Sequence, residues 1–349
     1  MKNLLKTSFV CAIALCGVKT TVAQDFEHAG QYMNYIGKAN EKITAMYLSY
    51  LSAVGHNKSA RKVEKRRQEV VSLIFNTRFD IQGMPAWKGD RSYRDTTVAY
   101  LKLMHNVFNE DYAKIVNMEE IAEQSYDAME AYMLAQEKAN KKLAEAVERH
   151  QQTQKEFAGK NDVKLLENTS TLEAKSKQAG ELMNHYGEVY LIFFKAYKQE
   201  AYLLQALEMK NITAIEQSKS ALRSYAEEGL EKLKHLKGYS NDPSLLIACR
   251  ESMKFYLSEA EKMNFASEFI LKEEAFNKMK KAIDSKPAAK RTEADIADYN
   301  KGVSDFNTAV HNYNAANNQM NKQRTATLNN WNNSVNKYLD TYMPYQKKG

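Results

Sequence analysis

Residues 181–209 read ELMNHYGEVYLIFFKAYKQEAYLLQALEM and are the most apolar segment after residue 23. Their apolar positions recur every three or four residues, which is the spacing of one face of an α-helix. One stripe runs through Leu182, Tyr186, Val189, Phe193, Ala196 and Leu203, and a second beside it through Tyr190, Phe194, Tyr197, Ala201 and Leu204. Together they are wider than a two-stranded coiled coil requires. The sequence therefore predicts a helix of about 40 Å that other helices surround.

Charged side chains interrupt this segment at Glu188, Lys195, Lys198 and Glu200. The longest uncharged run is much shorter than the roughly 20 residues that a bilayer-spanning helix needs. We therefore expect no transmembrane span in the mature chain.

The composition and the positions of the prolines indicate an all-α fold. The chain has 13 glycines and 4 prolines, and no segment longer than a few residues alternates apolar and polar residues as a strand does. Pro85, Pro243, Pro287 and Pro344 all fall between helically periodic segments. The pattern predicts helices at about residues 27–56, 59–82, 92–116, 118–157, 162–209, 212–236, 243–284 and 293–342.

Local signals mark several of these boundaries. The spacing of a capping box occurs at Asn117 with Glu120 and at Thr292 with Asp295. Helix ends are predicted at glycines that follow periodic segments, namely Gly83, Gly159 and Gly238.

The two halves of the chain share short motifs in the same order. Six pairs of matching residues, with the first-half residue given first, are Met33 and Met183, Gly37 and Gly187, Tyr47 and Tyr197, Lys88 and Lys237, Gly89 and Gly238, and Asn140 and Asn321. Each match alone can arise by chance, but the common order favours a duplication. We predict two tandem antiparallel four-helix units, residues 24–160 and 161–349, which share the long central helix at 162–209.

Residues 1–23 have the three parts of a secretory signal peptide. Lys2 and Lys6 precede an apolar core, and Thr21-Val22-Ala23 forms a small-residue cleavage site. The alternative is a membrane anchor that stays on the protein. With cleavage, the mature chain begins near Gln24 and lies in the periplasm, on the outer membrane surface or outside the cell.

The cysteine and charge counts argue against a disulfide-stabilised protein and against a nucleic-acid-binding protein. Of the 3 cysteines only Cys249 follows the predicted signal, so no intramolecular disulfide is possible. Its apolar neighbours favour a buried, unreactive thiol. The net charge of +7 falls to about +4 without the three lysines of the signal, which is too weak to indicate nucleic-acid binding.

The strongest charge feature is KSARKVEKRR, residues 58–67. Its six cations, against Glu64 alone, are Lys58, Arg61, Lys62, Lys65, Arg66 and Arg67. Like charges four residues apart share one helix face and weaken an isolated helix. Either acidic neighbours and water balance them, or they bind an anionic partner such as lipid, glycan or protein.

The loop MPAWKGDRSYR, residues 84–94, is a second candidate. Trp87 and Tyr93 lie there beside Lys88, Arg91 and Arg94. These side chains either form an exposed recognition tip, or Trp87 packs over the end of the bundle.

Metal and cofactor sites receive little support. His185 shares a helix face with Glu181 and Glu188, but di-iron bundles need Glu-x-x-His on two helices, and that motif does not occur. We expect no metal and no cofactor. The alternative is a periplasmic bundle that binds a small ligand or metal around His185 and Tyr186. Because nucleophile elbows and glycine-rich phosphate loops are also missing, we expect a protein that is not an enzyme.

Three runs resemble an uncharacterised family of exported, all-helical bacterial surface proteins. They are YMNYIG at 32–37, GHNKSARKVEKRR at 55–67 and LNNWNNSVNKYLDTYMP at 328–344. The resemblance covers most of the mature chain and implies a cell-envelope or surface address, with no established activity and no site residue. The sequence thus predicts an exported structural or interaction protein that contacts an anionic partner through residues 58–67.

Overall fold

A computed structural model describes residues 26–56, 59–115, 122–165 and 171–344. The predicted signal peptide, Lys58 and the Asn117–Glu120 capping box lie outside these residues. The helices are α1 (Ala29–Gly55), α2 (Ala60–Gln82), α3 (Ser92–Asn106), α5 (Tyr126–Lys160), α6 (Thr171–Glu208), α7 (Ile212–His235), α8 (Ser244–Lys262), α9 (Asn264–Ser285) and α10 (Glu293–Tyr342). A π-helical turn, Val107–Asp111, follows α3. Because the described residues form no strand, the all-α prediction is confirmed.

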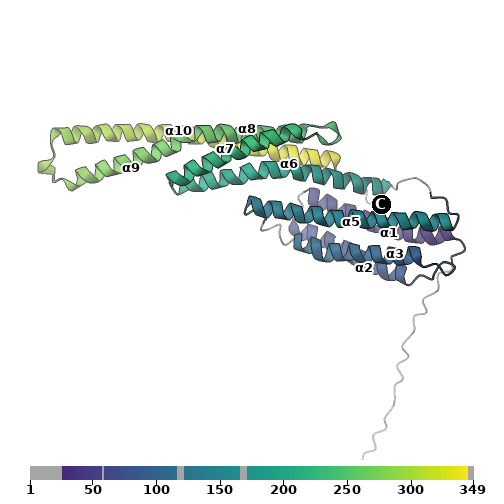
Figure 1. The fold of residues 1–349 in the computed structure, drawn as a ribbon. Coiled ribbons are helices and arrows are strands. Elements are labelled where there is room, and N and C mark those ends of the chain that lie inside the picture. The colour runs from purple at the N-terminus through teal and green to yellow at the C-terminus, as the bar shows by residue number, and fades with distance from the viewer. Residues whose placement is uncertain (1–25, 57–58, 116–121, 166–170, 345–349) are drawn as a thin grey trace, which may run out of the picture.

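The first four long helices pack in chain order, α1 against α2, α2 against α3 and α3 against α5. Aromatic rings fill the space between them. Tyr32 of α1 stacks on Phe157 of α5 with ring centroids 5.8 Å apart, and Tyr93 of α3 lies 5.3 Å from Phe157. In Figure 1 these helices form a bundle in which α1 and α5 lie nearer α10, and α2 and α3 lie on the side facing away from it.

The long helix α6 lies at the centre of the molecule, in contact with α1 and α5 on one side and with α7 and α8 on the other. Its first apolar stripe is largely buried, and Phe193 stacks on Trp331 of α10 at 4.2 Å. The predicted spine is therefore confirmed. The second stripe is less buried than expected, because Tyr197 lies at the surface.

The segment predicted as one helix at 243–284 is two helices, so that prediction is wrong. The chain bends at Met263, between α8 and α9. Beyond this bend α9 packs on the first half of α10, and the two form a hairpin that extends past the bundle (Figure 1). Ring stacking holds the hairpin together, with Phe276 on Phe306 at 4.6 Å and Phe269 on Tyr313 at 4.5 Å.

Two predicted helix starts are also wrong. The helix expected from residue 118 begins at Tyr126, where the hydroxyl of Ser125 accepts from the backbone N–H of Ala128 at 3.1 Å. Residues 161–165 are not helical, so the helix expected from residue 162 does not start there, and its described part is Thr171–Glu208. Gly159, expected as a helix end, lies within α5. At the two wrong starts, the helical spacing of apolar residues continues through positions where the backbone is not helical.

The bounds of α10 were predicted correctly. The hydroxyl of Thr292 accepts from the backbone N–H of Asp295 at 3.1 Å, and the Asp295 carboxylate accepts from the backbone N–H of Thr292 at 3.0 Å. This reciprocal capping box fixes the start of the helix. Ala309 is buried in its first half, whereas its second half buries Met320, Trp331, Val335, Tyr338 and Leu339.

Matching loops follow the second helix of each predicted unit. The carboxylate of Asp90 accepts from the backbone N–H of Ser92 at 2.7 Å, and that of Asp242 accepts from the backbone N–H of Ser244 at 2.8 Å. Each bond lies where the chain enters the third helix of its half. The duplication itself, and the division at residues 160 and 161, stay predictions with which this shared feature agrees.

Candidate functional site

The basic run occupies the first turns of α2. The side chains of Arg61, Lys62 and Lys65 are exposed, and within the described residues none of them forms an ion pair. Lys58 lies outside the described residues. Acidic residues are absent from the first turn of α2. This end of the helix therefore presents a cluster of cations to solvent.

Arg66 and Arg67, which the sequence places in the same run, are engaged within the protein. Arg66 pairs with Glu69 at 2.8 Å. Arg67 is only 4% exposed, and its guanidinium donates two bonds to Glu64, at 2.8 and 2.7 Å, and one at 2.6 Å to the carbonyl of Phe108. Including Arg67 in an exposed patch is therefore wrong, because this side chain ties α2 to the π-helical turn after α3.

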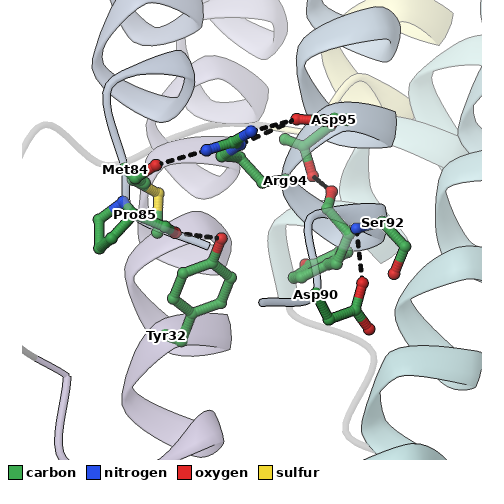
Figure 2. A network of polar contacts seen from close by, with 9 residues as sticks. Tyr32, Met84, Pro85, Asp90, Ser92, Arg94 and Asp95 are labelled. Atoms are coloured by element: carbon green, nitrogen blue, oxygen red, sulfur yellow. Dashed lines mark hydrogen bonds and ion pairs between the residues drawn. The ribbon is translucent and has the colours of Figure 1, made fainter. Parts of the chain in front are cut away.

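The loop between α2 and α3 is held from several sides (Figure 2). The hydroxyl of Tyr32 donates to the carbonyl of Pro85 at 3.1 Å, and the Arg94 guanidinium donates to the carbonyl of Met84 at 2.8 Å. At the tip of the loop Lys88 and Gly89 have positive φ angles of 47° and 86°. Gly89 adopts its angle without strain because it has no Cβ. The loop is thus a fixed cap on this end of the bundle.

The aromatic residues of this loop face inward. The indole N–H of Trp87 donates to the side-chain oxygen of Asn161 at 2.9 Å, and its ring is half-buried against Tyr32. Tyr93 is 0% exposed, packed between Phe157 and His150. The exposed recognition tip is therefore wrong for both aromatic residues, and Trp87 packs over the bundle end instead.

Replacing Asn161 with alanine is expected to lower the free energy of unfolding by about 1 kcal/mol, because the half-buried indole N–H of Trp87 loses its acceptor. Urea unfolding followed by circular dichroism measures the loss. Asn76→Ala, at an exposed position of α2, serves as the control and should change the value by less than about 0.5 kcal/mol. Equal effects of the two substitutions would contradict a structural role for the Trp87–Asn161 bond.

His185 is engaged at both ring nitrogens. Nε2 donates to the carbonyl of Lys237 at 2.8 Å, and Nδ1 accepts from the hydroxyl of Tyr338 at 3.2 Å. These bonds tie α6 to α10 and to the loop after α7. Tyr186, the other residue of the alternative ligand site, packs instead against Tyr190 at 5.6 Å. Within the described ranges, no three His, Cys, Asp or Glu side chains form a group able to hold a metal ion.

A buried charge cluster joins α6, α8 and α10. Arg324 donates through Nε to Glu200 at 2.6 Å and through Nη2 to Glu259. Glu200 is 2% exposed and Glu259 is 0% exposed. The second carboxyl oxygen of Glu259 and the hydroxyl of Tyr256 are buried without a hydrogen-bond partner among the described residues. Two carboxyl groups thus share one guanidinium away from water.

The protonation of Glu259 depends on this arrangement. Burial, followed by the negative charge of Glu200, raises the pKa of Glu259 from 4.5 to about 8, and Arg324 opposes the rise. A protonated Glu259 can donate a hydrogen bond to Glu200, which leaves one carboxylate to balance the guanidinium.

A groove of about 400 Å³ lies where α5, α6 and α7 meet. Lys195 lines it and pairs with Glu228 at 2.7 Å, with its ammonium 4.4 Å from the Tyr225 ring centroid and 5.2 Å from that of Tyr126. Each of these contacts favours a cation. The groove therefore holds a lysine clamp that ties the start of α5 to α6 and α7.

No family model, curated protein or solved structure matches this chain. The resemblance to exported surface proteins stays a prediction that rests on the three sequence runs. Among the described helices, none combines the length and hydropathy that a bilayer crossing requires.

Of the predicted site residues that the structure describes, Arg61, Lys62 and Lys65 are exposed together in the first turns of α2. Sequence reasoning missed the buried cluster, although one signal was present. Glu200 lies on the first apolar stripe, four residues after Ala196 and three before Leu203. A carboxylate at a core position of a helix requires a buried partner, and that requirement points to a distant arginine.

Proposed function

We propose that this chain is an exported, non-enzymatic interaction module of the bacterial cell envelope or surface, and that it attaches to an anionic partner through the first turns of α2. The observation that carries the proposal is the exposure of Arg61, Lys62 and Lys65 without an ion pair in the described structure. The proposed location at the cell envelope or surface rests on the signal-like residues 1–23 and on the resemblance to exported surface proteins given above.

These three cations do not help α2 to fold. Arg61 and Lys65 are four residues apart and repel each other on one face. The N-terminal end of a helix carries a partial positive charge, and cations there are unfavourable by a few tenths of a kcal/mol each. Arg67, two residues after Lys65, shows the contrast, because its charge is fully engaged inside the protein. A role in binding accounts for cations that folding does not require.

The test is retention on envelope fractions of the native organism. The variant Arg61→Glu/Lys62→Glu/Lys65→Glu is expected to lose retention while its helical circular dichroism stays unchanged, since all three side chains point to solvent. Retention of the unaltered protein should also fall as salt rises towards 1 M, where the Debye length is about 3 Å.

The matched control reverses three exposed cations elsewhere. Lys278, Lys280 and Lys281 of α9 are exposed, and Lys278→Glu/Lys280→Glu/Lys281→Glu changes the net charge by the same amount. This variant should be retained like the unaltered protein. Equal retention of both triple variants would show that the α2 cations are only a solvated face, and equal loss would show that net charge alone matters.

A further inference from the structure

The exposed side of α2 continues beyond its basic end. At about 100° per residue, Arg61 and Phe79 lie five full turns apart at the same angle around the helix. Lys65, Ser72 and Phe75 fall within about 40° of that line, and all five side chains are exposed. We refer to these five residues as the α2 face. It is basic in its first half and aromatic in its second.

The aromatic half is an exposed cluster. Phe75 and Phe79 are 43% and 49% exposed, and their rings meet edge to face with centroids 4.8 Å apart. The guanidinium of Arg78 lies 4.8 Å from the Phe79 centroid and 5.6 Å from that of Phe75. Two adjacent exposed phenylalanines next to a cation differ from apolar residues scattered singly over a surface.

The α2 face lies on an outer side of the molecule. α2 packs against α1 and α3, and in Figure 1 the α2 and α3 layer lies on the side remote from α10. At about 1.5 Å per residue, the 23 residues of α2 are about 35 Å long. A flat surface can therefore contact the whole α2 face at once.

We propose that the α2 face binds the surface of an anionic lipid bilayer, with Arg61 and Lys65 at the phosphate groups and Phe75 and Phe79 inserted at the boundary of the acyl chains. This inference rests on the proposed function and names the partner in it. Lys62, next to the face, adds to the attraction.

The combination of side chains favours lipid over an anionic glycan or protein. Interfacial helices use Lys and Arg on lipid headgroups and place Phe among the acyl chains. An anionic glycan supplies the negative charge but offers no apolar layer for two phenyl rings, whereas a bilayer offers both along the whole length of α2. Asp80, beside Phe79, opposes binding, so the basic half must supply the electrostatic attraction. Glu69 is already neutralised by Arg66.

The experiment is co-sedimentation of the full mature chain with vesicles of phosphatidylglycerol and phosphatidylcholine, and with vesicles of phosphatidylcholine alone. The protein is expected to sediment with the anionic vesicles and to stay in solution with the neutral ones. Arg61→Gln/Lys62→Gln/Lys65→Gln should weaken binding roughly a hundredfold, at about fivefold for each cation. Phe75→Ser/Phe79→Ser should weaken binding by roughly tenfold or more through lost apolar burial.

Two control variants distinguish the α2 face from exposed cations and exposed apolar residues elsewhere on the protein. Lys278→Gln/Lys280→Gln/Lys281→Gln removes three exposed cations from α9, and Leu271→Ser/Ile296→Ser removes two exposed apolar side chains from the hairpin. Both should bind anionic vesicles as the unaltered protein does. Circular dichroism of each variant verifies that its helices remain.

Each other outcome overturns the lipid proposal in a distinguishable way. Retention on native envelope fractions through the α2 cations, without binding to vesicles, would identify a protein or glycan partner and leave the proposed function standing. If Phe75→Ser/Phe79→Ser binds anionic vesicles as well as the unaltered protein does, binding is electrostatic and the phenyl rings do not insert. If the protein binds neither vesicles nor envelope fractions, the proposed function fails as well.

Discussion

Replacing Arg324 with leucine is expected to lower the free energy of unfolding by about 3–5 kcal/mol. The substitution removes the only guanidinium that contacts both Glu200 and Glu259 in the described structure and leaves the buried Glu200 carboxylate without a counter-charge. Breaking a buried charge network from one side costs more than the network itself contributes, because the remaining charge stays desolvated. Urea unfolding at neutral pH measures the loss.

Two comparisons test that explanation. Lys322→Leu, two residues earlier on the exposed side of α10, should change the free energy of unfolding by less than about 0.5 kcal/mol. The triple replacement Glu200→Leu/Glu259→Leu/Arg324→Met should recover most of the stability, because apolar packing often substitutes for a buried ion pair. Similar stabilities for Arg324→Leu and Lys322→Leu would refute the buried network as a determinant of folding.

The stability of the fold is expected to decrease as the pH rises from about 5 to about 8. The pKa of Glu259 is about 8 in the fold, against 4.5 for a glutamate exposed to water, so between these values the native state holds a proton that the unfolded state has lost. The free energy of unfolding therefore falls with rising pH, by on the order of 3 kcal/mol over this interval. Thermal unfolding at a series of pH values measures the change.

His150 acts in the opposite direction and must be separated from Glu259. Burial lowers the pKa of His150 from 6.5 to about 4, so its contribution to stability is lost as the pH falls through this interval. Stability should therefore be greatest at roughly pH 5 to 6. Glu259→Gln is expected to remove the decline towards pH 8 and to leave the acid side unchanged. If the decline persists in Glu259→Gln, it does not arise from this carboxyl group.

Sequence signals predicted the elements whose boundaries are encoded locally. Thr292 with Asp295 fixed the start of α10, and the apolar period identified α6 as the buried spine. The bend at Met263 was missed because no proline or glycine marks it and the apolar period continues across it. There, α8 packs on both α7 and α10, whereas α9 packs mainly on α10, so the bend depends on packing between helices.

In the candidate site, too, the local sequence predicts some features and contacts with distant residues determine the others. The sequence identifies a run of cations, and three of them are exposed. It does not distinguish Lys65 from Arg67, because the burial of Arg67 depends on a carbonyl at Phe108, 41 residues away. Similarly, the sequence leaves Trp87 either exposed or packed over the bundle end, and the choice depends on Asn161, 74 residues later, which accepts its N–H. Partners that are distant along the chain decide which members of a motif remain available.

The hairpin of α9 and α10 makes the molecule mechanically asymmetric. α10 is a single helix of 50 residues, about 75 Å long, that runs from the tip near residue 292 into the bundle. Apart from Ala309, its buried residues lie between Met320 and Leu339, so the first half acts as a lever that pivots near Arg324. A sideways force on the tip would therefore act as a torque on the buried charge cluster.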